Sequence, residues 1–156
     1  HVPWTTRAAE AGKHVLCEKP IALTAAEART LLEVRERTGV RIQEAFMVRT
    51  HPQWLKARQL VDDGSLGEVR AMSGFFSYDN DDPANVRNVP GFGGGGLLDI
   101  GCYLVHTARF IFEAEPSRVA GTLELDPRFG VDRLTSAAIE RGARARHQRI
   151  QPRDPA

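Results

Sequence analysis

Two polar side chains, Asp99 and Tyr103, stand out in the apolar run that follows the glycine-rich stretch 91–96. They would share one face if this run is helical, because residues i and i+4 lie above one another on a helix. A carboxylate and a phenol aligned in this way can serve as an acid/base pair. The same spacing also suits a buried tyrosine satisfied by a neighbour and an aspartate favoured by the positive end of a helix. Spacing alone leaves both interpretations open.

A second pair, Glu18 and Lys19, ends the short apolar run 14–18 directly before Pro20. Proline favours extended geometry in the residue before it, so this run predicts a strand that Lys19 closes. Ligands of open α/β sheets bind outside the carboxyl ends of the strands, which is where both side chains fall. An ammonium there can orient a substrate hydroxyl and favour ionisation of a nearby phenol. Taken alone, a lysine at a strand end is more often simply exposed.

The glycines at 91, 93 and 96 match the spacing G-x-G-x-x-G. A dinucleotide-binding fingerprint needs a buried strand directly before it and a ribose-binding acid at the end of a second strand. The preceding residues, NVRNVP, are typical of a loop, and Glu113 and Glu115 fall at the end of a predicted helix. We therefore expect these glycines to allow close backbone approach at a helix entrance rather than to bind a cofactor.

The elements that must position these residues follow from hydrophobic periodicity. Residues 14–18 predict a strand, residues 24–39 a helix with Thr24 and Glu27 at capping-box spacing, and residues 40–48 a second strand covered on both faces. Strand, helix and strand at these lengths predict a parallel βαβ unit.

The second half of the chain also alternates between helix and strand signals. Pro52 suits the first position of a helix that ends at Gly64, with Trp54, Ala57 and Val61 on one face. The patterns beyond it predict a strand over 68–79, a long loop over 79–96, a helix over 97–113 and a strand over 117–126. A loop of that length inside a compact domain is often functional.

Composition narrows the class of protein. The chain has 156 residues, 42% of them hydrophobic and 26% charged, with a net charge of +1, which is typical of a globular domain. No apolar stretch approaches the roughly 18 to 20 residues that span a bilayer, so we expect no membrane association. Cys17 and Cys102 lie apart in sequence without a Cys/His cluster, which favours a reducing, cytoplasmic location and no metal site. The arginine-rich end after residue 140 lacks aromatics, and we expect it to be solvated rather than bound to nucleic acid.

Together these stretches resemble one family. The segments AGKHVLCEKP, EAFMVRTHPQ, LVDDGSLGEVR and GGGGLLDIGCY, in this order, are similar to the Gfo/Idh/MocA oxidoreductases over roughly Val2 to Arg133. The resemblance implies an NAD(P)-binding Rossmann domain followed by an α/β substrate domain with a large open sheet. It also implies a sugar, polyol or related alcohol as substrate, and a homo-oligomer for the full-length protein.

The resemblance also assigns roles to individual residues. Lys19 matches the family lysine between nicotinamide and substrate, and Asp99 matches the aspartate that assists the reacting hydroxyl. Tyr103 falls where many members carry a catalytic histidine. Tyrosine there resembles the branch of glucose-fructose oxidoreductase and dimeric dihydrodiol dehydrogenase, and would act as general acid/base.

Three further positions have supporting roles by the same resemblance. Glu18 looks like the glutamate near the nicotinamide end of the cofactor, and Pro20 would hold the turn after Lys19, whose following peptide bond is commonly cis in the family. Arg87, in the long loop, is a candidate for a contact with substrate or cofactor. The resemblance implies NAD or NADP as cofactor and no metal.

The match also has gaps. No stretch before Gly91 supplies the true cofactor fingerprint, and the pattern fails after about Ser136, where arginine enrichment looks like a shifted reading frame. We expect residues 1–48 to be the C-terminal portion of a Rossmann-like domain, 49–136 a partial substrate domain and 137–156 a non-family basic tail. The sequence thus predicts an internal fragment of an oxidoreductase, inactive alone; the alternative is a non-enzymatic remnant or binding module.

Overall fold

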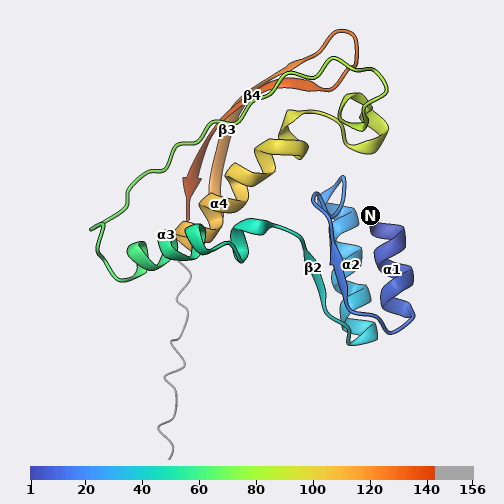
Figure 1. The fold of residues 1–156 in the computed structure, drawn as a ribbon, viewed down its shortest axis with the longest axis horizontal. Helices are drawn as coiled ribbons and strands as arrows, with labels where there is room; N and C mark the ends of the chain where they lie inside the picture. Colours follow the sequence, from blue (N-terminus) through green and yellow to red (C-terminus); the bar gives the residue numbers. More distant parts are fainter. Residues whose placement is uncertain (143–156) are drawn as a thin grey trace, which may run out of the picture.

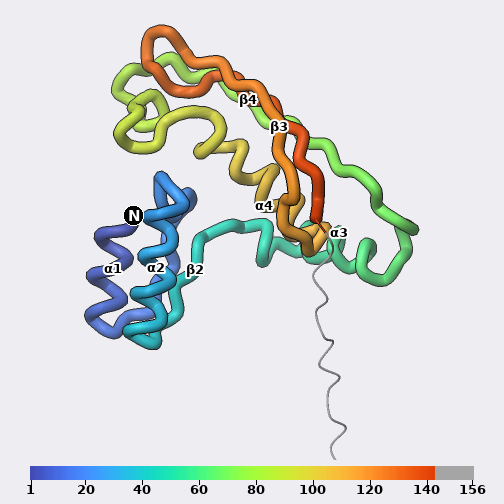
Figure 2. Tube along the Cα trace, turned by 180° about the vertical axis from the view of Figure 1, so that it is seen from behind, coloured from blue at the N-terminus to red at the C-terminus, as the bar shows by residue number. Residues whose placement is uncertain are grey.

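The structure, a computed structural model, describes residues 1–142 of the chain. In these residues the chain forms two lobes joined by a short crossing segment (Figures 1 and 2). The first lobe contains helix α1 (Val2–Glu10), strand β1 (Val15–Cys17), helix α2 (Ala25–Thr38) and strand β2 (Ile42–Glu44). Helices and strands alternate here, whereas in the second lobe the helices precede two strands; both lobes combine the two kinds of element, so the expected mixed α/β class is confirmed.

The first lobe contains the predicted parallel βαβ unit. Strand β1 pairs in parallel with β2, from Val15 opposite Ile42 to Cys17 opposite Glu44. A small core of Ala9, Val34 and Val40 joins α1 to α2, and Ile42 of β2 packs against it. The carboxyl ends of both strands therefore meet at one edge of the sheet.

Helix α2 begins and ends as the sequence predicts. The Thr24 hydroxyl accepts the Glu27 N–H, while the Glu27 carboxylate accepts the N–H groups of Leu23 and Thr24. Gly39 ends the helix in the left-handed region at φ 70°. A capping box and a glycine C-cap fix both ends of this helix and therefore the length of the crossover between the strands.

The predicted strand over 40–48 is too long. The ladder stops at Glu44, and after Ala45 the chain turns through the 3₁₀ helix η1 (Met47–Arg49). The reason is tertiary, because the apolar run is divided between two cores. Val48 packs with Phe110 and Ile111 of the second lobe, so it cannot also continue the first sheet.

The second lobe begins with helix α3 and ends with a long hairpin. Its elements are α3 (Pro52–Asp62), the 3₁₀ helices η2 (Val86–Asn88) and η3 (Pro90–Phe92), the π-helical turn η4 (Leu97–Gly101), α4 (Cys102–Phe112), and strands β3 (Pro116–Leu125) and β4 (Asp132–Arg141). Strands β3 and β4 pair antiparallel. As expected, Trp54, Ala57 and Val61 share the face by which α3 packs on the second core. None of the helices in the described part is long and apolar enough to cross a membrane.

The predicted strand over 68–79 forms no ladder in the described residues. The segment runs beside the β3–β4 hairpin (Figure 1). A groove of about 1160 Å³ separates it from β4, however, and side chains of α4 also line this groove. Strands pair only when their backbones lie about 4.8 Å apart, so an extended segment across such a groove has no partner. The strand predicted here is therefore wrong, because a sequence pattern cannot supply the neighbouring strand.

Strand β4 continues past the point where the sequence pattern fails. The ladder runs on beyond Ser136 to Arg141, which lies opposite Pro116. Backbone pairing with β3 holds these residues extended although their side chains show no alternation. The arginine-rich residues 143–156, on which the expectation of a solvated end partly rests, lie outside the described residues.

The glycine-rich stretch leads from η3 into η4 without a preceding strand. The backbone N–H groups of Gly94 and Gly95 donate to the carbonyls of Val89 and Arg87 at 3.1 and 2.8 Å, which folds the stretch back on the loop. Gly95 has a φ of 112° and lies against Asp132 of β4. This geometry agrees with close backbone approach at a helix entrance and lacks the strand that a dinucleotide fingerprint requires.

Gly94→Ala should therefore disturb folding rather than cofactor binding. A Cβ on Gly94 would lie 2.6 Å from the Arg87 carbonyl oxygen and 2.9 Å from the Val89 backbone, none of which can rotate away. We expect a loss of about 1 to 3 kcal/mol in the free energy of unfolding, measured by urea denaturation. Gly91→Ala is the matched control, since nothing lies within 4 Å of its added Cβ. Equal stability of the two variants would contradict this account.

Candidate active site

An ion pair between the two lobes forms the centre of the site. Lys19 follows β1, and its Nζ donates to Asp99 Oδ1 at 3.0 Å and also to the Asp99 backbone carbonyl. Both side chains are 13% exposed. Asp99 lies within η4, and π-helical turns occur frequently at functional sites. The pair thus joins the carboxyl edge of the first sheet to the helix entrance of the second lobe.

Two residues, one just before the long loop and one within it, donate to the other carboxylate oxygen of Asp99. The Tyr78 hydroxyl donates to Oδ2 at 2.7 Å, and Arg87 Nε donates to the same atom at 2.8 Å. Tyr78 ends the extended segment before the long loop, and Arg87 lies in η2 within that loop. Asp99 therefore receives three side-chain donors from three separate parts of the chain.

These contacts determine the ionisation of both acidic groups. Burial alone would raise the pKa of Asp99, but hydrogen bonds from Tyr78, Lys19 and Arg87 outweigh it and hold the pKa below its usual value. Burial, together with the hydrogen bond to Asp99 and its negative charge, raises the pKa of Tyr78 to about 12. At neutral pH Asp99 is thus an anion and Tyr78 a neutral phenol that donates to it.

Tyr103 lies beside the same ion pair. The Lys19 ammonium is 5.0 Å from the centroid of its ring, within the range of a cation–π contact. Phe46 meets the ring edge-on at a centroid distance of 5.5 Å, and Phe76 lies at 6.3 Å. No described residue forms a hydrogen bond with the Tyr103 hydroxyl. The ring is held by packing, while its hydroxyl keeps its hydrogen-bonding capacity for a ligand.

His106 lies one turn after Tyr103 on α4 and packs against the aromatic ring of Phe46. Its ring stacks on Phe46 with centroids 4.0 Å apart and planes at 11°. Burial, assisted by the charges of Arg49 and Arg109, lowers its pKa. Its Nε2 is buried and has no hydrogen-bond partner among the described residues. We interpret His106 as a neutral ring that packs Phe46 against Tyr103.

The structure brings Lys19, Asp99, Tyr103 and Arg87 together, but it leaves Glu18 outside. Glu18 is exposed and forms no hydrogen bond within residues 1–142. The peptide bond between Lys19 and Pro20 is cis. The carboxylate that does contact this turn is Glu44, at the end of β2, which accepts the Ile21 N–H at 2.7 Å.

Sequence reasoning missed five residues of this site. Tyr78, Phe46 and Phe76 were expected to be strand residues, while Glu44 and His106 received no role. Only Tyr78 had a usable signal, since it is one of two tyrosines in the chain and directly precedes the long loop that carries Arg87. Contacts between residues twenty or more positions apart have no local periodicity, so spacing could not have found the others.

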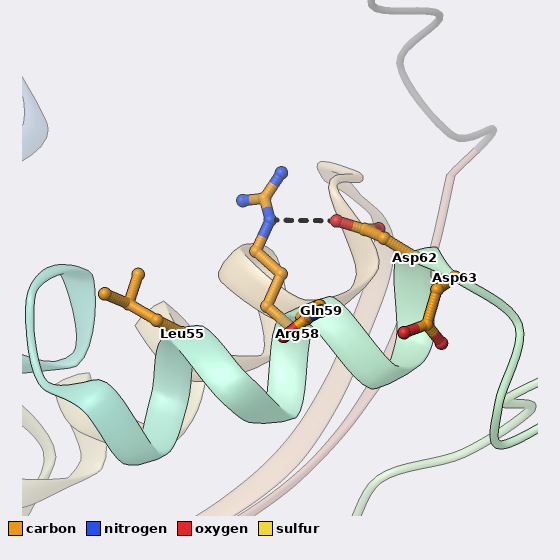
Figure 3. Close-up of a pocket in the computed structure, with 5 residues that line it drawn as sticks. All are labelled: Leu55, Arg58, Gln59, Asp62 and Asp63. Carbon is orange, nitrogen blue, oxygen red and sulfur yellow. Dashed lines mark hydrogen bonds and ion pairs between the residues drawn. The ribbon is translucent and has the colours of Figure 1, made fainter.

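Another hollow, on α3, has no comparable chemistry. Figure 3 shows Leu55, Arg58, Gln59, Asp62 and Asp63 around it, with Arg58 Nε donating to Asp62 at 3.4 Å. Arg58 also pairs with Glu113 and lies 4.9 Å from the Phe110 ring centroid. It therefore connects α3 to the end of α4. Across residues 1–142, no group of three or more His, Cys, Asp or Glu side chains is arranged to hold a metal ion.

In this structure a parallel βαβ unit places a lysine at its carboxyl edge, opposite an aspartate and a tyrosine of the second lobe. This arrangement is typical of two-lobed α/β proteins with a ligand site at the strand ends, a class that includes nicotinamide-dependent dehydrogenases. The chain belongs to the Gfo/Idh/MocA oxidoreductase family. The GFO/IDH/MocA C-terminal domain matches residues 54–147, and the oxidoreductase family with an NAD-binding Rossmann fold matches residues 1–46. The resemblance seen in the sequence motifs is thereby confirmed.

Several relatives support this membership. The chain is 54% identical to an uncharacterized oxidoreductase of Rhizobium meliloti, over 89% of the chain and 42% of that protein. It is 40% identical to a D-xylose 1-dehydrogenase (NADP⁺) of Haloferax volcanii, over 94% of the chain and 45% of that protein. A mutant 3-ketoreductase from Actinomadura kijaniata, solved with TDP-benzene and NADP, matches with a TM-score of 0.81 at 30% identity, over 90% of the chain and 43% of the reductase. The chain spans less than half the length of these proteins.

Proposed function

We propose that the protein transfers a hydride between NAD(P) and a sugar, polyol or related alcohol. The observation that carries this proposal is the cluster of Lys19, Asp99 and Tyr103, which joins the carboxyl edge of a parallel sheet to the second lobe. Dehydrogenation of an alcohol needs a group that takes the hydroxyl proton as the hydride leaves. Tyr103 meets that requirement as its phenolate, with the Lys19 ammonium beside it as the counter-charge.

Each residue of the cluster has a distinct part in the proposed reaction. Lys19 donates a hydrogen bond to the reacting oxygen and orients it, while Asp99 holds the ammonium in place. During oxidation Tyr103, as its phenolate, takes the substrate hydroxyl proton and becomes the phenol, and during reduction of a carbonyl the phenol supplies that proton. Its hydroxyl has no hydrogen-bond partner in the described residues. The aromatic rings of Phe46 and Phe76 flank the Tyr103 ring and hold it in place. Bound NAD(P) would accept or supply the hydride at the same substrate carbon.

The described residues fit one end of this cofactor better than the other. The nicotinamide end would lie at the carboxyl edge of β1 and β2, next to Lys19, with Glu18 and Pro20 as the proposed flanking contacts. A pyrophosphate needs a helix N-terminus with free N–H groups. At α2 the capping box works against a pyrophosphate, because the Thr24 hydroxyl occupies the Glu27 N–H and the Glu27 carboxylate places a negative charge beside the helix N-terminus.

A chimaera tests the proposed function. Residues 1–141 replace the matching stretch of the Rhizobium meliloti oxidoreductase, and formation of NAD(P)H is followed with a panel of aldoses and polyols. We expect turnover by the chimaera. The 156-residue chain alone should bind NAD(P)H too weakly to saturate in calorimetric titration, because nothing described supplies the pyrophosphate site. A chimaera that folds and binds NADP⁺ but oxidises no member of the panel would contradict the proposal.

The negative charge at the N-terminus of α2 also favours a second candidate function, that of a non-enzymatic binding module that retains the substrate side of the site. A chain that binds a sugar without NAD(P)H, and a chimaera without turnover, would favour it.

We further propose a cytoplasmic location, which two free cysteines suit. A homo-oligomer and the domain boundary near residue 48 are proposed on the same family grounds. Because the family match continues to residue 147, we place the start of the proposed non-family tail after that residue.

A further inference from the structure

We infer that Tyr78 is a positioning residue, whose hydroxyl holds Asp99 ionised and turned so that the carboxylate fixes the Lys19 ammonium beside Tyr103. The inference rests on the geometry around Asp99. Its consequence for turnover rests in addition on the proposed function.

The two oxygens of the Asp99 carboxylate face different groups. Oδ1 receives Lys19 at 3.0 Å, while Oδ2 receives Tyr78 at 2.7 Å and Arg87 at 2.8 Å. Hydrogen bonds on Oδ2 fix the rotation of the carboxylate, and that rotation determines where Oδ1 points. Because Lys19 also donates to the Asp99 backbone carbonyl, the position of its ammonium depends on both the side chain and the backbone of Asp99.

The same contacts argue against Asp99 as the acid/base group itself. A carboxylate that already accepts three donors, and whose pKa is held low by them, has little tendency to take a proton at neutral pH. Asp99 thus acts through Lys19, and Tyr78 acts through Asp99. Arg87 shares this work; it is 46% exposed, about as much as Tyr78, and its ion pair is screened by solvent more than the Lys19 pair.

Tyr78 differs from Arg87 in what its substitution changes. It comes from the extended segment before the loop and contributes one neutral hydroxyl, so Tyr78→Phe removes a single hydrogen bond without altering the net charge. The ring is 45% exposed, and its phenylalanine counterpart keeps the same packing. Any change in the ionisation of Asp99 then reports the lost hydroxyl rather than a lost charge.

The test is a titration of the Asp99 carboxyl carbon by NMR in the full 156-residue chain. The groups that influence this carboxylate are Lys19 after β1, Tyr78 and Arg87 on the loop side, and Cys102 at the start of α4; Asp132 of β4 faces Tyr78, and Glu44 of β2 faces Cys102. Tyr78→Phe removes a donor to the anion, so the pKa of Asp99 should rise toward its usual value of 3.8. Phe75→Leu, a neighbouring aromatic that is 86% exposed, is the matched control and should leave the titration unchanged.

Kinetics of the chimaera give the second measurement. We expect Tyr78→Phe to lower kcat about 10-fold with little change in KM, as the loss of one hydrogen bond to a charged group implies. An unchanged Asp99 titration in a folded Tyr78→Phe chain would overturn the inference, whatever the activity. A shifted titration together with an inactive parent chimaera would instead contradict the proposed function and leave the positioning role supported.

Discussion

Tyr103→Phe in the chimaera should lower kcat by about 10² to 10⁴ while KM for the substrate changes little. The substitution removes the proposed acid/base group and keeps the ring that packs between Phe46, Phe76 and the Lys19 ammonium. The lost hydroxyl has no hydrogen-bond partner among the described residues, so the melting temperature should stay within a few degrees of the parent. Steady-state kinetics and calorimetry of the purified variant measure both quantities.

Phe92→Leu is the control for Tyr103→Phe, because this aromatic is 70% exposed in the glycine-rich stretch and contacts none of the cluster. It should keep near-parental turnover. Near-parental turnover by Tyr103→Phe, combined with selective loss of NAD(P)H binding in Gly94→Ala, would invert the assignment. The glycine-rich stretch would then be the cofactor loop after all.

Lys19→Ala should be at least as damaging to kcat as Tyr103→Phe, and it should also destabilise the fold. The ammonium is the proposed orienting group for the substrate oxygen, and it is the only donor on Asp99 Oδ1 among the described residues. Its removal leaves a part-buried carboxylate with Tyr78 and Arg87 alone. We expect a loss of about 1 to 3 kcal/mol in the free energy of unfolding by urea denaturation.

Lys56→Ala provides the matched comparison, since Lys56 is exposed on α3 and its ammonium donates to Gln59 of the same helix. This variant should match the parent in both turnover and stability. If Lys19→Ala lost stability but kept turnover, Lys19 would be a structural link between the lobes without a part in the reaction. The proposal for the whole cluster would then fail.

Local sequence determined the elements whose ends depend on nearby residues. The capping box of Thr24 and Glu27 and the left-handed Gly39 fix α2, and Pro52 fixes the start of α3, because all of these interactions lie within four residues along the chain. The parallel pairing of β1 with β2 followed from the length of the crossover. Motif order predicted the family, and with it the proximity of Lys19 to Asp99 and Tyr103.

Tertiary structure alone decided the features that depend on distant partners. Val48 left the first sheet because the second core buries it, and Phe46 packs on Tyr103 and His106 instead. Residues 68–79 formed no ladder because a groove separates them from β4. Tyr78 and Arg87 reach Asp99 from 21 and 12 residues away. A strand forms only beside a neighbouring strand, and a carboxylate is held only by nearby donors. Because these partners are distant along the chain, neither contact produces a periodic pattern in the sequence. The sequence by itself therefore determined which side chains are available for chemistry, whereas the packing of the two lobes determined which of them meet.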